Sequence, residues 1–219
     1  MATAYSEYVA HPRYGQGPRY SGVDVDLAAP ETILNATTGC YNLAIRATIE
    51  RMGVGSGFAT LDPAGIVPGT AVVADPARQN RDDRRVGVTH YFDLERTCRR
   101  CRRPFLFFAE QQRHWYEELG FTLHSDCVEC YECRRADWDL KRRQRRYEEL
   151  LARPHRTAAE TVEAAECCLC LIEAGRFTPR QARRVRYFVN QLLPETGDQA
   201  EVQSLYDRVR LIEVRSAAS

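Results

Sequence analysis

Nine cysteines are the residues of this chain with the clearest chemical potential, because thiolates bind metals, form disulfides and act as nucleophiles. Cys98 and Cys101 form one C-x-x-C pair, and Cys130 and Cys133 form a second pair after a gap of 28 residues. Two such pairs can supply four thiolates to one tetrahedral zinc ion, so the spacing predicts a Zn²⁺ site. The full set is Cys40, Cys98, Cys101, Cys127, Cys130, Cys133, Cys167, Cys168 and Cys170.

A disulfide framework is the competing interpretation of these cysteines. An odd number of thiols in a chain without an export signal favours metal binding or core packing instead. Residues 1–10 lack the basic and apolar segments of a signal peptide, and no stretch approaches the roughly 18 apolar residues of a membrane span. We therefore expect a cytoplasmic protein without a membrane partner.

The second half of the predicted site leaves alternatives open. Cys130 and Cys133 precede a helix-forming stretch, and residues three apart in a first helical turn share a face that favours anionic ligands. Cys127 is the runner-up, because it can pair with Cys130 one turn earlier. His124 can replace one thiolate, although a surface imidazole is the simpler reading.

The elements that position these cysteines follow from turn residues and periodicity. Pro104–Ala109 reads as a short strand, and Glu110–Leu119 reads as a helix that Gly120 ends. Arg134–Ala152 has helix-forming composition up to Pro154. A cysteine knuckle, a β-rich return and a helix at the second ligand pair together describe a treble-clef-like zinc site.

The flanks on either side of this module differ in character. Residues 1–30 are rich in Tyr, Pro and Gly and should be turn-rich, and we expect a short helix over Tyr41–Met52. Residues 65–74 and 86–94 read as two short strands. The C-terminal third reads as three helices, expected over Thr157–Ala174, from the Thr178-Pro179 cap to Leu193, and over Gln199–Glu213.

The expected fold class is therefore α+β. It combines a small four-cysteine treble-clef or zinc-ribbon module with a loop-rich N-terminal region and an all-helical C-terminal region. The corresponding domains are residues 1–85, with a short helix and strands, 86–153, the zinc module, and 154–219, the helical region.

Residues 90–150 also resemble a known family. The pattern Cys98-Arg-Arg-Cys101, an aromatic strand, Glu110-Gln111 before an aromatic-rich helix, and Cys130-Tyr-Glu-Cys133-Arg134 is similar to the probable zinc-ribbon or treble-clef family of bacterial proteins. Its members are mostly uncharacterised. The resemblance implies zinc ligation by the same four cysteines, which are Cys98, Cys101, Cys130 and Cys133. Cys127 is the departure, a fifth cysteine inside the module.

Catalysis has no positive support in the sequence. Four thiolates close the zinc shell, whereas a catalytic zinc keeps an open position. We find no Walker A loop, no G-x-S-x-G elbow and no H-E-x-x-H motif. We therefore expect a structural metal, no enzyme activity and no small-molecule substrate.

Charge is balanced overall and concentrated locally. The chain has 31 Lys+Arg and 30 Asp+Glu, a formal net charge of +1, which excludes a strongly basic coat protein. Residues 134–146 nevertheless contain seven basic and two acidic groups. This stretch suggests a nucleic-acid-binding helix, with Tyr131 or Trp138 available to stack on bases. The candidate residues are Arg134, Arg135, Arg142, Arg143, Arg145 and Arg146.

Other interpretations compete with nucleic-acid binding. Residues 91–153 carry 14 basic and 12 acidic groups, so the arginines can equally form a solvated, ion-paired face. A protein–protein adaptor with structural zinc is the second hypothesis. A thiol or zinc redox switch, based on Cys127 and the 167–170 cluster, is the third.

Two apolar clusters are expected to be core. The aromatic residues of the module are needed for its own packing, and the Cys-Cys-Leu-Cys run lies among aliphatic residues in a predicted helix. They are Phe105, Phe107, Phe108, Trp115, Tyr116 and Phe121 in the first cluster and Cys167, Cys168 and Cys170 in the second.

Overall fold

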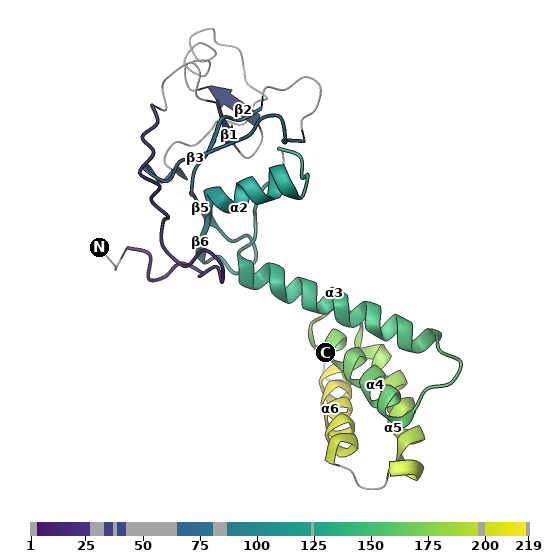
Figure 1. Ribbon diagram of the computed structural model, residues 1–219. Coiled ribbons are helices and arrows are strands. Elements are labelled where there is room, and N and C mark those ends of the chain that lie inside the picture. Colours follow the sequence, from purple (N-terminus) through teal and green to yellow (C-terminus); the bar gives the residue numbers. More distant parts are fainter. Residues whose placement is uncertain are drawn as a thin grey trace, which may run out of the picture. The chain divides into compact units, whose positions relative to one another are not determined.

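The computed structural model describes residues 4–26, 33–36, 39–42, 65–80, 87–123, 125–196 and 200–217. Its contacts divide the chain into two compact units, Met1–Arg134 and Arg135–Ser219, and each is described by itself below (Figure 1). This division falls inside the predicted 86–153 module, because one helix contributes its first turn to the first unit and the remainder to the second. The three-segment organisation itself stays a prediction.

Short strands form two small sheets in the first unit. One sheet has the order β2-β1-β4-β3, built from β1 (Ile33–Ala36), β2 (Gly39–Asn42), β3 (Val72–Val73) and β4 (His90–Tyr91). β1 pairs antiparallel with β2 and parallel with β4, and β3 pairs antiparallel with β4. The strands expected within 65–74 and 86–94 are therefore present but short. The second sheet is an antiparallel hairpin of β5 (Leu94–Thr97) and β6 (Pro104–Phe107), which encloses the first cysteine pair.

The helix expected over Tyr41–Met52 needs correction at its start. Tyr41 and Asn42 belong to β2, where they pair with Leu34 and Ile33. Backbone pairing in the β1–β2 hairpin outweighs the weak helical stripe that suggested a helix there. Residues 43–52 of the expected helix lie outside the described residues, as does His124.

The N-terminal segment is turn-rich, as expected, and packs against β6. The Val9 N–H donates to the Pro104 carbonyl oxygen at 2.8 Å, and Val9 forms a parallel bridge with Phe105. Tyr14 joins a buried cluster with Val67, Leu106 and Phe108. The segment thus supplies core residues to the cysteine-bearing hairpin, a contact between distant parts of the chain.

The hairpin leads into one continuous helical stretch. Helix α2 (Ala109–Arg113) passes directly into a π-helical turn, η2 (His114–Glu118), and the chain turns at Gly120 with φ +69°. This matches the predicted Glu110–Leu119 helix and its glycine stop. The expectation that the module's aromatics form its core is confirmed for the four that are buried, Phe105, Phe107, Phe108 and Tyr116. Trp115 packs against the core while partly buried, and the expectation is wrong for Phe121, which is 42% exposed.

Asp93 connects three segments of the first unit from a position that is only 1% exposed. Its carboxylate accepts hydrogen bonds from the backbone N–H groups of Arg19 at 2.8 Å and Ala109 at 2.7 Å. Its own N–H donates to the Thr70 hydroxyl oxygen at 2.9 Å. A buried carboxylate needs such donors, and these hold the N-terminal segment and the start of α2 against the end of β4.

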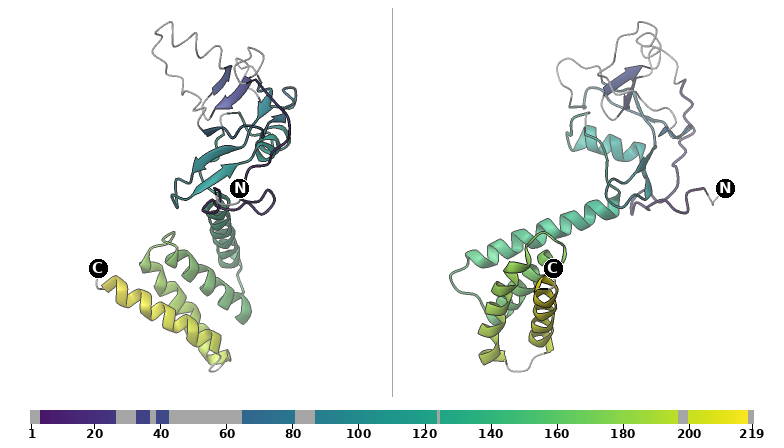
Figure 2. Two further views of the ribbon diagram at one scale, coloured as in Figure 1. Left: turned by 90° about the vertical axis from the view of Figure 1, so that its left-hand side faces the viewer. Right: turned by 180° about the vertical axis from the view of Figure 1, so that it is seen from behind.

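In its described residues, the second unit consists of helices and the turns that connect them. It contains most of α3 (Tyr131–Ala152), then α4 (Ala158–Glu173), the 3₁₀ turn η3 (Pro179–Gln181), α5 (Ala182–Thr196) and α6 (Ala200–Ala217). Helices α4, α5 and α6 pack on one another, as both views of Figure 2 show. The three predicted helices are therefore present. α5 ends at Thr196 rather than Leu193, and α6 runs on to Ala217.

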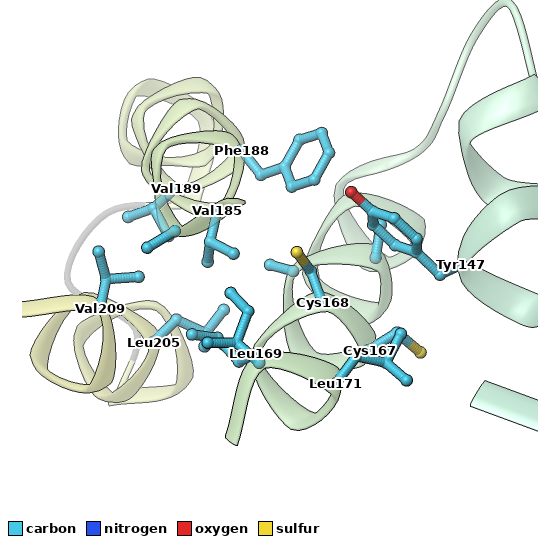
Figure 3. Close-up of a cluster of buried hydrophobic side chains, with 14 of the residues drawn as sticks. Tyr147, Cys167, Cys168, Leu169, Leu171, Val185, Phe188, Val189, Leu205 and Val209 are labelled. Carbon is cyan, nitrogen blue, oxygen red and sulfur yellow. The ribbon is translucent and has the colours of Figure 1, made fainter. Parts of the chain in front are cut away.

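The core of this unit contains the second cysteine cluster. Cys167 and Cys168 are buried, and Figure 3 shows Cys168 between Tyr147 and the side chains of α5. Leu169 and Leu171 are also fully buried. The prediction that these thiols are core residues is confirmed for Cys167 and Cys168, and Cys170 is half-buried.

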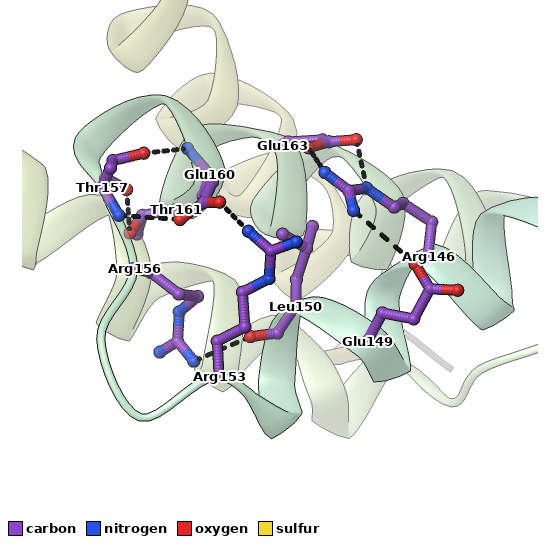
Figure 4. A network of polar contacts seen from close by, with 9 residues as sticks. All are labelled: Arg146, Glu149, Leu150, Arg153, Arg156, Thr157, Glu160, Thr161 and Glu163. Carbon is purple, nitrogen blue, oxygen red and sulfur yellow. Dashed lines mark hydrogen bonds and ion pairs between the residues drawn. The ribbon is translucent and has the colours of Figure 1, made fainter.

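Polar contacts bind the end of α3 to α4 (Figure 4). The Arg146 guanidinium donates to both carboxylate oxygens of Glu163, at 2.8 and 2.7 Å. Thr157 caps α4 with a reciprocal capping box, in which its hydroxyl accepts from the Glu160 N–H and its N–H donates to the Glu160 carboxylate. Such a box satisfies two N–H groups that otherwise lack partners.

Among the described residues, no helix combines the length and the apolar character needed to cross a lipid bilayer.

Candidate metal centre

The first cysteine pair lies in the turn of the β5–β6 hairpin. The Cys98 N–H donates to the Arg103 carbonyl oxygen, and the Arg102 N–H donates to the Cys98 carbonyl oxygen, both at 2.9 Å. Arg102 closes the turn with φ 63°, in the left-handed region where glycine is the usual residue. The turn folds the backbone around the Cys98 sulfur and leaves the Cys101 side chain exposed.

The second pair lies at the start of α3. Cys130 directly precedes the helix, and its carbonyl oxygen accepts the Arg134 N–H at 3.1 Å. Cys133 follows within the first turn. The helix begins at Tyr131, three residues before the predicted start, so both thiols lie at the helix N-terminus where the backbone favours negative charge.

The structure brings the four first-choice cysteines together. Their Sγ atoms all lie within 4.8 Å of one another, in the arrangement that can hold a metal ion. The Cys101 and Cys130 sulfurs are 3.8 Å apart. A tetrahedral zinc with Zn–S bonds of about 2.3 Å requires sulfurs separated by about 3.8 Å, so the spacing suits that ion.

Hydrogen bonds and burial set the protonation of these sulfurs. Burial opposes ionisation of Cys98, but the N–H groups of Cys101, Cys130 and Arg100 outweigh it and lower the pKa of this thiol to about 6. Burial raises the pKa of Cys130 and of Cys133. Neighbouring thiolates are costly unless a cation neutralises them, and a bound metal deprotonates its thiol ligands. The donor set therefore fits a thiophilic divalent metal.

Cys127 lies outside this cluster. Its side chain is 1% exposed, and its thiol donates to the Glu129 carbonyl oxygen at 3.4 Å. Burial raises its pKa to about 12, and its sulfur is not among the four that converge. The geometry thus favours the first choice of ligands over the runner-up, while metal binding itself stays a prediction.

A comparison with protein families identifies the module. Residues 92–145 match the family model described as a probable treble clef domain. This part of the chain is a treble clef domain. Searches of curated proteins and of solved structures gave no significant match. The expected resemblance is therefore confirmed for the treble clef, and its four cysteines are the ones brought together in the structure.

Arg134 has an internal role in the treble clef domain that the sequence did not reveal. Its guanidinium lies over the Trp115 ring, 5.0 Å from the ring centroid. With the Gln111 amide oriented so that its oxygen faces the guanidinium, that oxygen accepts from Arg134 at 2.9 Å. Arg134 thereby ties the first turn of α3 to the α2–η2 stretch. The Glu110-Gln111 motif of the family pattern is the signal in the sequence that could have pointed to this contact.

The remaining predicted nucleic-acid contacts fall into two groups. Arg146 is held by its bidentate pair with Glu163, and Arg135 pairs with Asp139 at 3.7 Å. Arg142 also pairs with Asp139, at 3.1 Å, but its side chain is 80% exposed. Arg143 and Arg145 are exposed and make no ion pair within the described residues. We call the face of α3 that carries Arg142 and Arg145 its outer face; Arg143, the residue after Arg142, points about 100° away from Arg142.

The large apolar side chain of Trp138, on the same helix, is exposed to solvent. It is 76% exposed, more than any other large hydrophobic residue described. Arg142 and Arg145 follow it at i+4 and i+7, which places all three on one face of α3. An exposed indole beside two guanidinium groups can offer a ring for stacking and cations for phosphate.

Proposed function

We propose that Cys98, Cys101, Cys130 and Cys133 bind one structural Zn²⁺ ion. The observation that supports this proposal is that four sulfur atoms from two backbone turns lie within 4.8 Å of one another. Four thiolates fill the coordination shell, so the ion would hold the β5–β6 turn to the start of α3 and leave no position for a substrate. The proposed role is accordingly binding rather than catalysis.

Zinc analysis of the purified protein and of single variants tests this ligand set. We expect about one zinc per chain in the parent protein and a loss of most of it in Cys98→Ser and Cys133→Ser, because serine is a poor zinc ligand. Cys127→Ser is the matched control and should retain the parent stoichiometry. Retention of zinc in Cys133→Ser together with its loss in Cys127→Ser would show that the ligands are assigned incorrectly.

We further propose that the outer face of α3 binds nucleic acid. Support comes from Arg142 and Arg145, which are exposed, and from Trp138 on the same face of the helix. Exposed ion pairs such as Arg142–Asp139 are worth only about 0.5 kcal/mol, so a phosphate can replace the carboxylate at little cost. Arg134 and Arg146 instead stabilise the protein, and the proposal does not depend on them.

Charge reversal on α3 tests whether nucleic acid binds this helix in particular or is attracted by any positive charge on the protein. We expect Arg145→Glu to weaken binding of a single-stranded oligonucleotide. The slope of log K against the logarithm of the salt concentration should become shallower by about one. Arg210→Glu is the control, because this arginine of α6 is exposed and has no ion pair among the residues that the structure describes, and it should change both quantities less. Trp138→Ala should cost about 1–3 kcal/mol of affinity if bases stack there.

Two results would count against this function. Absence of oligonucleotide binding at low salt would contradict the proposed function. Equal effects of Arg145→Glu and Arg210→Glu would show that binding reflects nonspecific charge attraction and not a site on α3. In either case the exposed Trp138 face would fit the alternative of a protein partner, because tryptophan and arginine are the residues most enriched in binding hot spots.

A further inference from the structure

A second collection of arginines surrounds a cavity in the helical unit. The cavity lies where α5 begins, next to the C-terminal part of α6, and has a volume of about 670 Å³. Its polar lining consists of Thr178, Arg180, Arg183, Arg186 and Glu213. Sites for small ligands commonly have volumes of about 300–1,000 Å³, so the cavity can hold a group larger than a single phosphate.

The charges around this cavity are unbalanced. Arg186 pairs with Glu213, the one carboxylate of the lining. Arg180 and Arg183 make no ion pair within the described part of the chain. Three arginines and one glutamate leave an excess of two positive charges around the cavity. The arginines follow one another at intervals of three residues, where like charges repel.

Thr178 adds a hydroxyl that the fold does not use. It occupies the N-cap position before η3, yet its side chain makes no capping hydrogen bond. Thr157, the N-cap of α4, uses its hydroxyl in a capping box. The Thr178-Pro179 pair was expected to cap a helix, and the structure instead leaves its hydroxyl at the edge of the cavity, available as a donor.

We propose that this cavity binds a phosphate-bearing anion of the pyrophosphate class. Arg180 and Arg183 would contact phosphate oxygens, since guanidinium groups bind phosphate through paired N–H donors, and the Thr178 hydroxyl would donate to a further oxygen. Arg186 is a positioning residue, oriented by Glu213. The phosphate group belongs either to a small molecule or to the 5′ end of a nucleic acid.

Titration calorimetry with inorganic pyrophosphate tests the site in the full-length, zinc-loaded protein. We expect Arg183→Gln to weaken binding about tenfold or more, the range for a lost hydrogen bond to a charged group. Arg210→Gln is the matched control on α6 and should leave the affinity within about twofold. Thr178→Ala should weaken binding while Thr178→Ser restores it, and thermal unfolding should show that both variants remain folded.

Two further arms identify the source of the phosphate. A gain in oligonucleotide affinity from a 5′-phosphate, lost in Arg183→Gln but kept in Arg145→Glu, would support binding of a nucleic-acid end. Pyrophosphate binding without any such gain would support a small molecule. No pyrophosphate binding at low salt, equal binding of citrate, or equal weakening by Arg210→Gln would overturn the proposal. Because these variants lie outside α3, failure here leaves the proposed nucleic-acid face untouched.

Discussion

Removing the proposed zinc ion with a chelator is expected to unfold the first unit, up to Arg134, and to leave α4, α5 and α6 folded. Structural zinc contributes about 10–16 kcal/mol to folding in small zinc domains, while whole domains are stable by only about 5–15 kcal/mol. The strands here are short, and Cys98 and Cys130 lie within the core itself. The helical unit has a separate core that includes Leu169 and Val185.

Tryptophan emission can follow this unfolding. Trp115 and Trp138 are the two tryptophans of the chain. Trp115 packs against Phe107, with ring centroids 5.1 Å apart, and against Arg134. In a Trp138→Phe variant the emission reports on Trp115 alone, and chelation should shift it to longer wavelength.

Helical circular dichroism and metal analysis complete the experiment. The helical signal at 222 nm should fall only in part, because most of the helix lies in the second unit. Readdition of Zn²⁺ should restore the emission. An unchanged Trp115 spectrum in protein shown to be metal-free would contradict the idea that the metal holds the treble clef domain together.

Asp93→Ala is expected to lower the free energy of unfolding by about 2–5 kcal/mol, the second large effect. The substitution leaves the N–H groups of Arg19 and Ala109 without an acceptor, and each unsatisfied buried donor costs about 1–3 kcal/mol. Denaturant unfolding of the zinc-loaded protein, with Trp115 as the reporter, measures this loss. Amide exchange should accelerate first at Arg19, because its N–H loses the carboxylate that accepts it.

Asp75→Ala provides the comparison for Asp93→Ala. Asp75 is exposed and its carboxylate accepts one hydrogen bond, from the Ala77 N–H at 3.0 Å. Its loss should cost less than about 1 kcal/mol. If the two aspartates cost the same, burial and the two donors would not explain the importance of Asp93.

Local patterns were enough to predict the cysteine cluster and most helices. The C-x-x-C spacing, the glycine at 120 and the proline at 154 act within a few residues, so they determine turns and helix ends without help from the rest of the fold. Cys130 and Cys133 could be preferred over Cys127 for the same reason. The treble clef domain was accordingly recognisable before its geometry was known.

Contacts between distant segments were not predictable from the same patterns. The packing of Val9 on Phe105 and the bonds of Asp93 to Arg19 join residues separated by more than seventy positions. Such contacts depend on which backbone groups remain unsatisfied once the rest of the unit is folded. The β1–β2 hairpin, in which Tyr41 pairs with Leu34 only seven residues away, is instead a local contact that the apolar stripe of residues 43–52 concealed.

The fate of each arginine was equally hidden in the sequence. Arg145 and Arg146 are adjacent, yet Arg145 is exposed and has no ion partner in the described part of the chain, while Arg146 is held by Glu163. The difference arises because successive helical residues point about 100° apart, and only one direction faces α4. Composition can therefore count charges but cannot say which of them a ligand can reach.

Helix α3 has a consequence for how the protein can be divided. Its first turn carries Cys133, a member of the sulfur cluster, and its last turns carry Tyr147 and Leu150, which are buried in the helical core. A cut at the unit boundary after Arg134 would keep these residues with their own units, but it would separate the first turn of α3 from the turns that continue and stabilise it. Expression fragments of the two halves should therefore overlap, each retaining the whole of α3, and any recombination that exchanges the treble clef domain between proteins would have to carry the entire helix with it.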